Sequence, residues 1–146
     1  LVDLPEQIAI ARGNLECSLS RLDFYEADLL NSETAFPAGQ DVIWMSQFLS
    51  CFDKPSILGI FQRVKASLNA DGNVYVLDTF WDRQRHDIAA YCIINTSPYF
   101  TALANGVSKM YPSEAYIKLA KLAGLQLADI RDDIGLSHSL MKFTHA

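Results

Sequence analysis

The residues best suited to chemistry begin at the start of the chain, where an aspartate follows a short apolar run. Leu1-Val2-Asp3-Leu4-Pro5 has the pattern of the last residues of a buried strand, with Asp3 at the carboxyl end and Pro5 opening a helix. Ligands of open α/β sheets bind beyond the carboxyl ends of the strands. A carboxylate there can accept hydrogen bonds from both hydroxyls of a nucleoside ribose. Asp3 is therefore a candidate cofactor ligand, and we expect the glycine-rich turn that usually accompanies such a residue upstream of Leu1.

The cysteines do not indicate a metal or redox site. Cys17, Cys51 and Cys92 are odd in number and lack the CxxC spacing of zinc and redox centres. No signal peptide or long apolar span is visible in the sequence. We therefore predict no metal and a cytoplasmic location.

Composition excludes several classes of partner. Of the 146 residues, 50% are hydrophobic and 20% are charged, which is typical of one globular domain with a proper core. Twelve basic and seventeen acidic residues give a net charge of −5 without charge runs. This balance argues against nucleic acid or a membrane surface as a partner.

Strand-like and helix-like segments alternate along the chain, and these elements must position the candidate residues. Helices are expected over 6–14, from Pro55 to about 68 with Ile57, Phe61, Val64 and Leu68 on one face, over 84–105 with an interruption near Pro98, and over 112–123. Strands are expected at 1–3, 21–28, 41–49, 73–80, 126–131 and 139–143. The 41–49 segment is apolar on both faces and is expected mid-sheet, and the last two strands should pair antiparallel. The pattern predicts an α/β fold with a Rossmann-like sheet and a reversed strand near one edge.

Four segments in this order carry a family resemblance: Asp3-Leu4-Pro5, Glu26-Ala27-Asp28-Leu29, Asp41-Val-Ile-Trp-Met-Ser-Gln-Phe-Leu49 and Leu68-Asn-Ala-Asp-Gly-Asn-Val-Tyr-Val-Leu-Asp78. The chain resembles the S-adenosylmethionine-dependent small-molecule O-methyltransferases, namely the plant phenolic enzymes and their bacterial relatives. The resemblance covers nearly all of residues 1–146 as a partial catalytic domain. It begins at the family's second strand, without the first strand, the glycine-rich turn and the N-terminal dimerisation domain. It implies S-adenosylmethionine as cofactor, a homodimer for the full-length protein and an inactive fragment.

The resemblance assigns cofactor contacts residue by residue. Asp3 matches the acid that binds the ribose hydroxyls, Asp28 matches the residue that reaches the adenine amino group, and Leu29 matches the side chain against the adenine face. Ser46 is a further candidate for cofactor binding. The alternative is that Asp3 and Asp28 only cap a helix or a turn, as aspartates often do.

The catalytic positions depart from the family pattern. The family's histidine base falls at Ser50, and a serine hydroxyl is no general base at neutral pH. Of the two acids that orient that histidine, the first is matched by Asp78 and the second falls at Met110. Cys51 stands where the family often has an acid, and we interpret it as a small packed side chain rather than a nucleophile.

His138 is a candidate replacement base. The family's last strand lies between its fifth and sixth strands, which would place the start of this chain's last strand near Asp78. An imidazole held by a carboxylate can take a proton from a phenolic or carboxylic acceptor. The alternative is a loop histidine bonded to the backbone. His86 and His145 are less suited, since one lies at a charged helix start and the other at the end of the chain.

The apolar region after the fifth strand offers residues for an acceptor pocket. The candidates are Phe80, Trp81, Tyr91, Asn95, Tyr99, Phe100, Asn105 and Tyr111. Small-molecule sites are mostly apolar with a few placed polar groups, although aromatic side chains also belong to cores.

The resemblance therefore implies methyl transfer from S-adenosylmethionine to an oxygen of a small hydroxylated or carboxylated, aromatic molecule. The alternative function is a catalytically inactive binding or dimerisation module, which the broken catalytic positions favour. A nicotinamide-dependent oxidoreductase fits less well, because Asp28 and the reversed last strand match the methyltransferase pattern.

Overall fold

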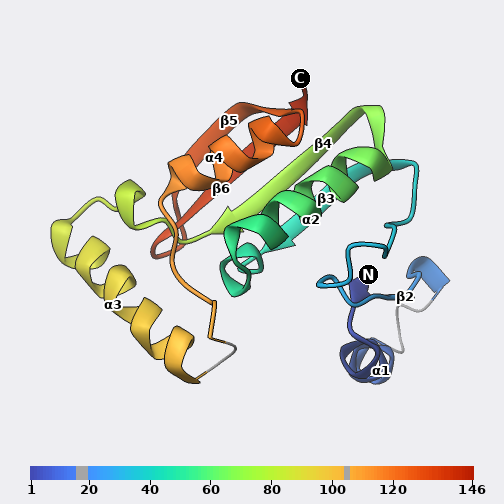
Figure 1. Cartoon of the computed structure of the whole chain (residues 1–146), viewed down its shortest axis with the longest axis horizontal. Coiled ribbons are helices and arrows are strands. Elements are labelled where there is room, and N and C mark those ends of the chain that lie inside the picture. Colours follow the sequence, from blue (N-terminus) through green and yellow to red (C-terminus); the bar gives the residue numbers. More distant parts are fainter. Residues whose placement is uncertain (16–19, 104–105) are drawn as a thin grey trace. The chain divides into compact units, whose positions relative to one another are not determined.

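The computed structural model describes residues 1–15, 20–103 and 106–146 (Figure 1). The chain divides into two compact units, Leu1–Pro37 and Ala38–Ala146, and each is described by itself.

The first unit is built on a pair of short parallel strands. β1 (Val2–Asp3) pairs with β2 (Tyr25–Glu26), and Asp3 lies opposite Glu26. Helix α1 (Pro5–Asn14) follows β1, with Pro5 in its first turn as expected. The strand expected over 21–28 is reduced to two residues, because β1 offers only two residues with which it can pair.

The second unit holds a four-stranded mixed sheet in the order β3-β4-β6-β5 (Figure 1). Its strands are β3 (Gln40–Ser46), β4 (Leu68–Asp78), β5 (Leu125–Ile134) and β6 (His138–His145). β3 runs parallel to β4, whereas β6 is antiparallel to both of its neighbours. The α/β fold with a reversed last strand is therefore confirmed.

Helices α2 (Lys54–Ser67) and α4 (Ser113–Leu122) lie on one face of this sheet (Figure 1). The residues predicted to share a face of α2, namely Ile57, Phe61, Val64 and Leu68, are all buried. Phe61 meets Phe143 of β6 edge to face at 5.8 Å between ring centroids. This apolar layer holds β4 and β6 in place, and these strands carry Asp78 and His138.

β3 differs from expectation. It lies at the end of the strand order rather than in the middle, and Val42 and Trp44 are each 55% exposed. The reason is that α2 and α4 both pack on the same face of this sheet (Figure 1). Neither helix therefore buries the side chains on the other face of β3.

Asp71 and Gly72 lie inside β4, which begins at Leu68 rather than at the expected residue 73, and the register with β3 shifts between Gln40 and Val42. A Cβ on Gly72 would lie 2.9 Å from the carbonyl oxygen of Gln40 and 2.7 Å from Cγ of Leu68. Gly72 is thus required by close approach of the two strands.

Two short 3-10 turns and one long helix complete the unit. The turns are η2 (Leu49–Cys51) and η3 (Trp81–Arg83), each following the carboxyl end of a parallel strand. Helix α3 (Asp87–Leu103) continues through Pro98, so the expected interruption is absent, since the proline removes only one backbone donor. None of the described residues of α3 is buried.

Candidate active site

Asp78, the last residue of β4, is the most constrained polar side chain of the second unit. It is 2% exposed. Its Oδ1 accepts the backbone N–H of Thr79 at 2.8 Å, and its Oδ2 accepts the hydroxyl of Tyr116 at 3.0 Å. The backbone N–H of Ser50 lies near the carboxylate and favours its charged form. Burial raises the pKa of Asp78 above its ordinary value, and these donors together with nearby His138 partly offset that rise.

Tyr116 reaches Asp78 from α4 and is itself fixed by aromatic neighbours. Its ring meets Phe80 edge to face at 5.1 Å and lies 5.8 Å from the ring of Tyr111. Burial, followed by the charge of Asp78, raises the pKa of Tyr116 far above that of a free phenol. The Tyr116 hydroxyl therefore stays protonated and donates to the carboxylate.

His138 begins β6 beside this site. The next residue, Ser139, is the register partner of Asp78, and the charge of His138 lowers the pKa of Asp78. The Nε2 atom of His138 is buried and, among the residues that the structure describes, has no hydrogen-bond partner. The carbonyl of the preceding Ser137 accepts from Gln84 at 3.0 Å, which ties the start of β6 to the segment after η3.

Ser50 and Cys51 lie in η2 on another side of Asp78. The Ser50 N–H favours the charged form of Asp78, and the Ser50 carbonyl accepts the backbone N–H of Lys109 at 3.0 Å. Partial burial, followed by the charge of Asp78, raises the pKa of the Cys51 thiol. A thiol with a raised pKa is a poor nucleophile, which agrees with our interpretation that Cys51 is not a nucleophile. The residue is exposed, so the expected packing as a small buried side chain is wrong.

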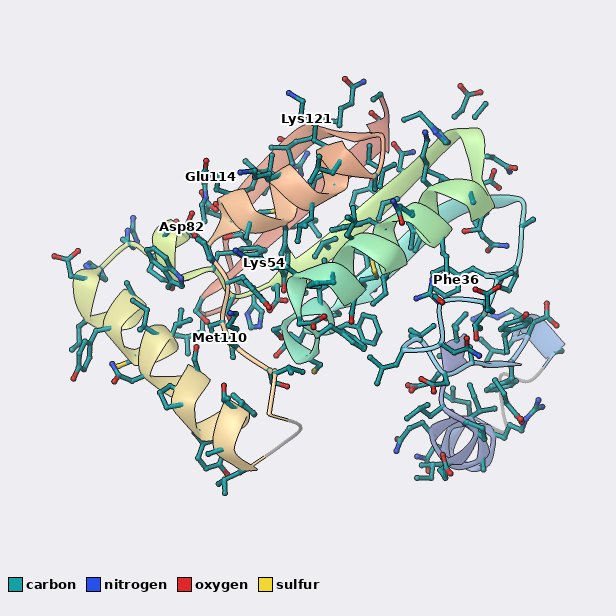
Figure 2. The ribbon with its side chains drawn as sticks, in the orientation of Figure 1. Phe36, Lys54, Asp82, Met110, Glu114 and Lys121 are labelled. Atoms are coloured by element: carbon teal, nitrogen blue, oxygen red, sulfur yellow. The ribbon has the colours of Figure 1, made fainter. Side chains whose placement is uncertain are left out.

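Met110, which the family resemblance aligns with the second acid, contacts the residue that follows Asp78. The hydroxyl of Thr79 donates to the sulfur of Met110 at 3.8 Å. Figure 2 labels Met110 on the segment that leads into α4. A thioether cannot replace a carboxylate in orienting an imidazole.

A cavity of about 390 Å³ opens beside η2. Its lining includes Asp53, Lys54, Thr101, Val107, Lys109 and Tyr111. The hydroxyl of Tyr111 donates to the carbonyl of Phe52 at 2.9 Å, and the ammonium of Lys109 lies 5.2 Å from the Tyr111 ring. This volume suits a small organic molecule.

The other predicted pocket residues are dispersed. Phe80 is fully buried in the core, where it packs on Tyr116, and Trp81 is half-buried in η3. Tyr91, Asn95, Tyr99 and Phe100 are exposed on α3, and the Asn95 amide bonds to the Tyr91 carbonyl of the same helix. Asn105 lies outside the described residues. Of the predicted set, the described lining of the cavity includes Tyr111.

The predicted cofactor residues of the first unit follow its two parallel strands. Asp3 accepts the N–H of Leu4 at 2.8 Å, and Asp28 accepts the N–H of Leu30 at 2.9 Å. Both aspartates are exposed. Asp28 caps a turn, as the alternative interpretation expected, whereas Asp3 does not cap α1, whose N-cap position is Leu4 without a side-chain cap bond. A carboxylate offers about four acceptor positions, so one such bond leaves capacity for a ligand. Ser46, in the second unit, is exposed at the end of β3.

Two residues of the site, Tyr116 and Asp82, were not found by sequence reasoning. Tyr116 lies in the helix predicted over 112–123, and its phenol hydroxyl was the signal that this residue, once buried, needs a polar partner. Asp82 accepts both the N–H and the hydroxyl of Ser113, the first residue of α4. Figure 2 shows Asp82 beside the start of α4, near Glu114.

Comparison with protein families identifies the class. Residues 1–126 match the O-methyltransferase domain family, and the chain belongs to that family. Comparison with curated proteins finds no significant match.

Solved structures share the fold. The mitomycin 7-O-methyltransferase MmcR is 18% identical and superposes with a TM-score of 0.82 over 100% of this chain and 41% of its own. The O-methyltransferase NcsB1 from neocarzinostatin biosynthesis, in complex with S-adenosylmethionine and 2-hydroxy-5-methyl naphthoic acid, is 18% identical with a TM-score of 0.78, over 99% and 40%. A protein described as a pericyclic reaction enzyme is 20% identical with a TM-score of 0.81, over 100% and 36%. This chain thus spans about two fifths of the length of these proteins.

Within the residues that the structure describes, no group of three or more His, Cys, Asp or Glu side chains is arranged to hold a metal ion. No described helix combines the length and apolar character needed to cross a membrane.

Proposed function

We propose that this chain forms part of the catalytic domain of an S-adenosylmethionine-dependent O-methyltransferase. The acceptor is an oxygen of a small hydroxylated or carboxylated, aromatic molecule. The observation that carries the proposal is the family match over residues 1–126. The complex of NcsB1 with S-adenosylmethionine and a naphthoic acid supports the cofactor and the acceptor class.

The activity is proposed for the protein made from the complete reading frame, because the chain spans only about 41% of MmcR. For that protein we also propose a homodimer in the cytoplasm. The cytoplasmic location is supported by three cysteines without the spacing of a paired framework.

Asp3, Asp28, Leu29 and Ser46 are the residues proposed to hold the cofactor. The fit is best supported for Asp3 and Asp28, because both are exposed, follow neighbouring parallel strands and have acceptor capacity beyond their local backbone bonds. When bound, S-adenosylmethionine supplies an electrophilic methyl group on a sulfonium centre.

His138 is proposed as the base and Asp78 as the carboxylate that acts on it. A buried nitrogen without a partner carries a desolvation cost of about 1–3 kcal/mol, and Nε2 of His138 is such an atom among the described residues. An acceptor hydroxyl that donates to Nε2 would relieve this cost and deliver its proton to the imidazole. The negative charge of Asp78 would then stabilise the imidazolium.

The cavity beside η2 is proposed to receive the acceptor. It is lined by Tyr111 and Lys109, and the Lys109 N–H bond to Ser50 joins this wall to the turn that also contacts Asp78. Tyr111 supplies an aromatic wall. Phe80 would hold the ring of Tyr116 in place by its edge-to-face contact. The other predicted acceptor contacts stay predictions: Trp81, Tyr91, Asn95, Tyr99 and Asn105.

The test uses the complete protein, methyl-labelled S-adenosylmethionine, and a panel of phenols and aromatic carboxylic acids. We expect label in an ether or ester product. His138→Gln should lower turnover at least tenfold with unchanged cofactor affinity, because the imidazole acts on the acceptor. His86→Gln, which removes an exposed histidine at the start of α3, is the matched control. Equal turnover of the wild type and His138→Gln would contradict the assigned base.

The second candidate function is a methyltransferase-like module that binds the cofactor without transferring the methyl group. The observation that favours it is Ser50, which the resemblance aligns with the family's histidine and whose N–H lies near Asp78. A protein described as a pericyclic reaction enzyme has a similar fold, so the fold alone does not determine the reaction. Cofactor binding without product across the whole panel would favour this alternative.

A further inference from the structure

Tyr116 stands out among the groups that hold Asp78, because it is the side-chain donor of the two hydrogen bonds that the described residues make to that carboxylate. Thr79 donates its backbone N–H from the position next to Asp78, whereas Tyr116 lies 38 residues further along the chain on α4. The Tyr116 ring is 1% exposed. A buried phenol is costly without a partner, and here its hydroxyl is directed onto one carboxylate oxygen.

The surroundings restrict Tyr116 to this geometry. Phe80 packs edge to face on its ring, and Tyr111 lies beside it with its own hydroxyl bonded to the Phe52 carbonyl. The start of α4 is fixed by the bonds from Ser113 to Asp82. The carboxylate plane of Asp78 is thus held at both oxygens, at Oδ1 by Thr79 and at Oδ2 by Tyr116.

The charge of Asp78 depends on these donors. Burial disfavours the charged carboxylate, and each hydrogen bond to that carboxylate favours it. The titratable groups that face Asp78 are Cys51 from η2, Tyr116 from α4 and His138 from β6. Of these, His138 can carry a compensating positive charge, and Tyr116 can donate without changing its own charge.

We propose that Tyr116 is a positioning residue of the methyltransferase site, whose hydroxyl orients the Asp78 carboxylate and keeps it ionised so that Asp78 can act on His138. This inference rests on the proposed function for its effect on turnover. The effect of the Tyr116 hydroxyl on the Asp78 carboxylate does not depend on methyl transfer. The positioning role and the proposed function can therefore be tested separately.

The first experiment follows the side-chain carboxyl carbon of Asp78 by NMR through a pH titration of the 146-residue chain, with Asp78→Asn to assign the signal. Tyr116→Phe keeps the ring and removes the donor, so the titration midpoint should move up by about 0.5–1 pH unit. Tyr111→Phe removes a buried hydroxyl of the same aromatic cluster that bonds to a backbone carbonyl, and should leave the midpoint in place. An unchanged midpoint in Tyr116→Phe, or an equal change in both variants, would overturn the proposal.

A second substitution covers the case in which Tyr116→Phe does not fold. Replacing Tyr116 by 3,5-difluorotyrosine makes the phenol a stronger donor with little change of shape, so the Asp78 midpoint should move to lower pH. A midpoint that stays the same would again overturn the proposal.

The last experiment measures turnover of the complete protein against pH. Tyr116→Phe should lower kcat with unchanged KM for S-adenosylmethionine, and should move the acidic limb of the pH profile upward with the Asp78 midpoint. A shifted Asp78 midpoint with an unchanged kcat profile would reduce Tyr116 to a structural role and overturn the proposal. Failure of the proposed function has a different signature, because the wild type would then form no methylated product while the titration shift of Asp78 persists.

Discussion

Asp82 caps helix α4 from outside the helix, since Ser113 donates to it both the backbone N–H at 2.7 Å and the side-chain hydroxyl at 2.6 Å. The residue at the N-cap position itself, Pro112, makes no side-chain cap bond. The carboxylate of Asp82, 31 positions before Ser113, therefore accepts the hydrogen bonds from the first turn of α4, the helix that carries Tyr116.

Asp82→Ala should lower the free energy of unfolding by about 1–2 kcal/mol, because it leaves two donors at a helix start without their acceptor. Urea unfolding of the 146-residue chain is the measurement. Asp71→Ala, which removes an exposed carboxylate in β4, is the matched control and should change stability by less than about 0.5 kcal/mol. Equal effects of the two substitutions would show that the contact with Ser113 does not stabilise α4.

The raised pKa of Asp78 predicts the sign of a pH effect. Burial holds its folded-state pKa above the ordinary 3.8, so the native state binds this proton more tightly than the unfolded chain does. The resulting stability is fully present below pH 3.8 and is lost as pH rises through the folded pKa. The unfolding free energy of the wild type minus that of Asp78→Asn should therefore fall between about pH 4 and neutrality. A rise of this difference over the same range would contradict the dominance of burial.

The bidentate ion pair of Arg83 with Asp132 joins η3 to β5 and should be weak. A double-mutant cycle with Arg83→Gln and Asp132→Asn should give a coupling of about 0.2–1 kcal/mol, because both side chains are about one third exposed. The hydrogen bond from Arg83 lowers the pKa of Asp132, so this contribution is present above the ordinary pKa and is lost as pH falls through the folded value. The coupling should also decrease in 1 M salt, and a salt-independent value would argue against an ionic origin.

Gly72→Ala should destabilise the second unit by about 1–3 kcal/mol, because the new methyl group overlaps the Gln40 carbonyl and Leu68. Gly59→Ala is the contrasting control. Gly59 lies inside α2 with open space around a built Cβ, so alanine there should stabilise the protein by about 0.5–1 kcal/mol. Thermal unfolding of the two variants should thus shift in opposite directions, and a neutral Gly72→Ala would show that β3 and β4 can separate without cost.

Much of this protein was accessible from its sequence. The buried face of α2 follows from the spacing of Ile57, Phe61 and Val64, because a helix repeats every 3.6 residues and that repeat is local. The start of α4 after Pro112 is predicted by an equally local signal. The antiparallel pairing of the last two strands was predicted from their closeness in sequence, which is again a local signal.

The family's strand order predicted His138 near Asp78, whereas the hydrogen bond from Tyr116 to Asp78 was decided by the tertiary structure alone. Ser50, Tyr116 and His138 come from three elements separated by many residues, and no periodicity links them to β4. The same holds for the exposed face of Trp44 in β3, since apolar composition does not say which elements will cover a strand. The side-chain period of a helix or strand and its local hydrogen bonds depend on residues that are close in sequence. The partners of a buried carboxylate depend on how distant elements pack, and that is a property of the folded chain.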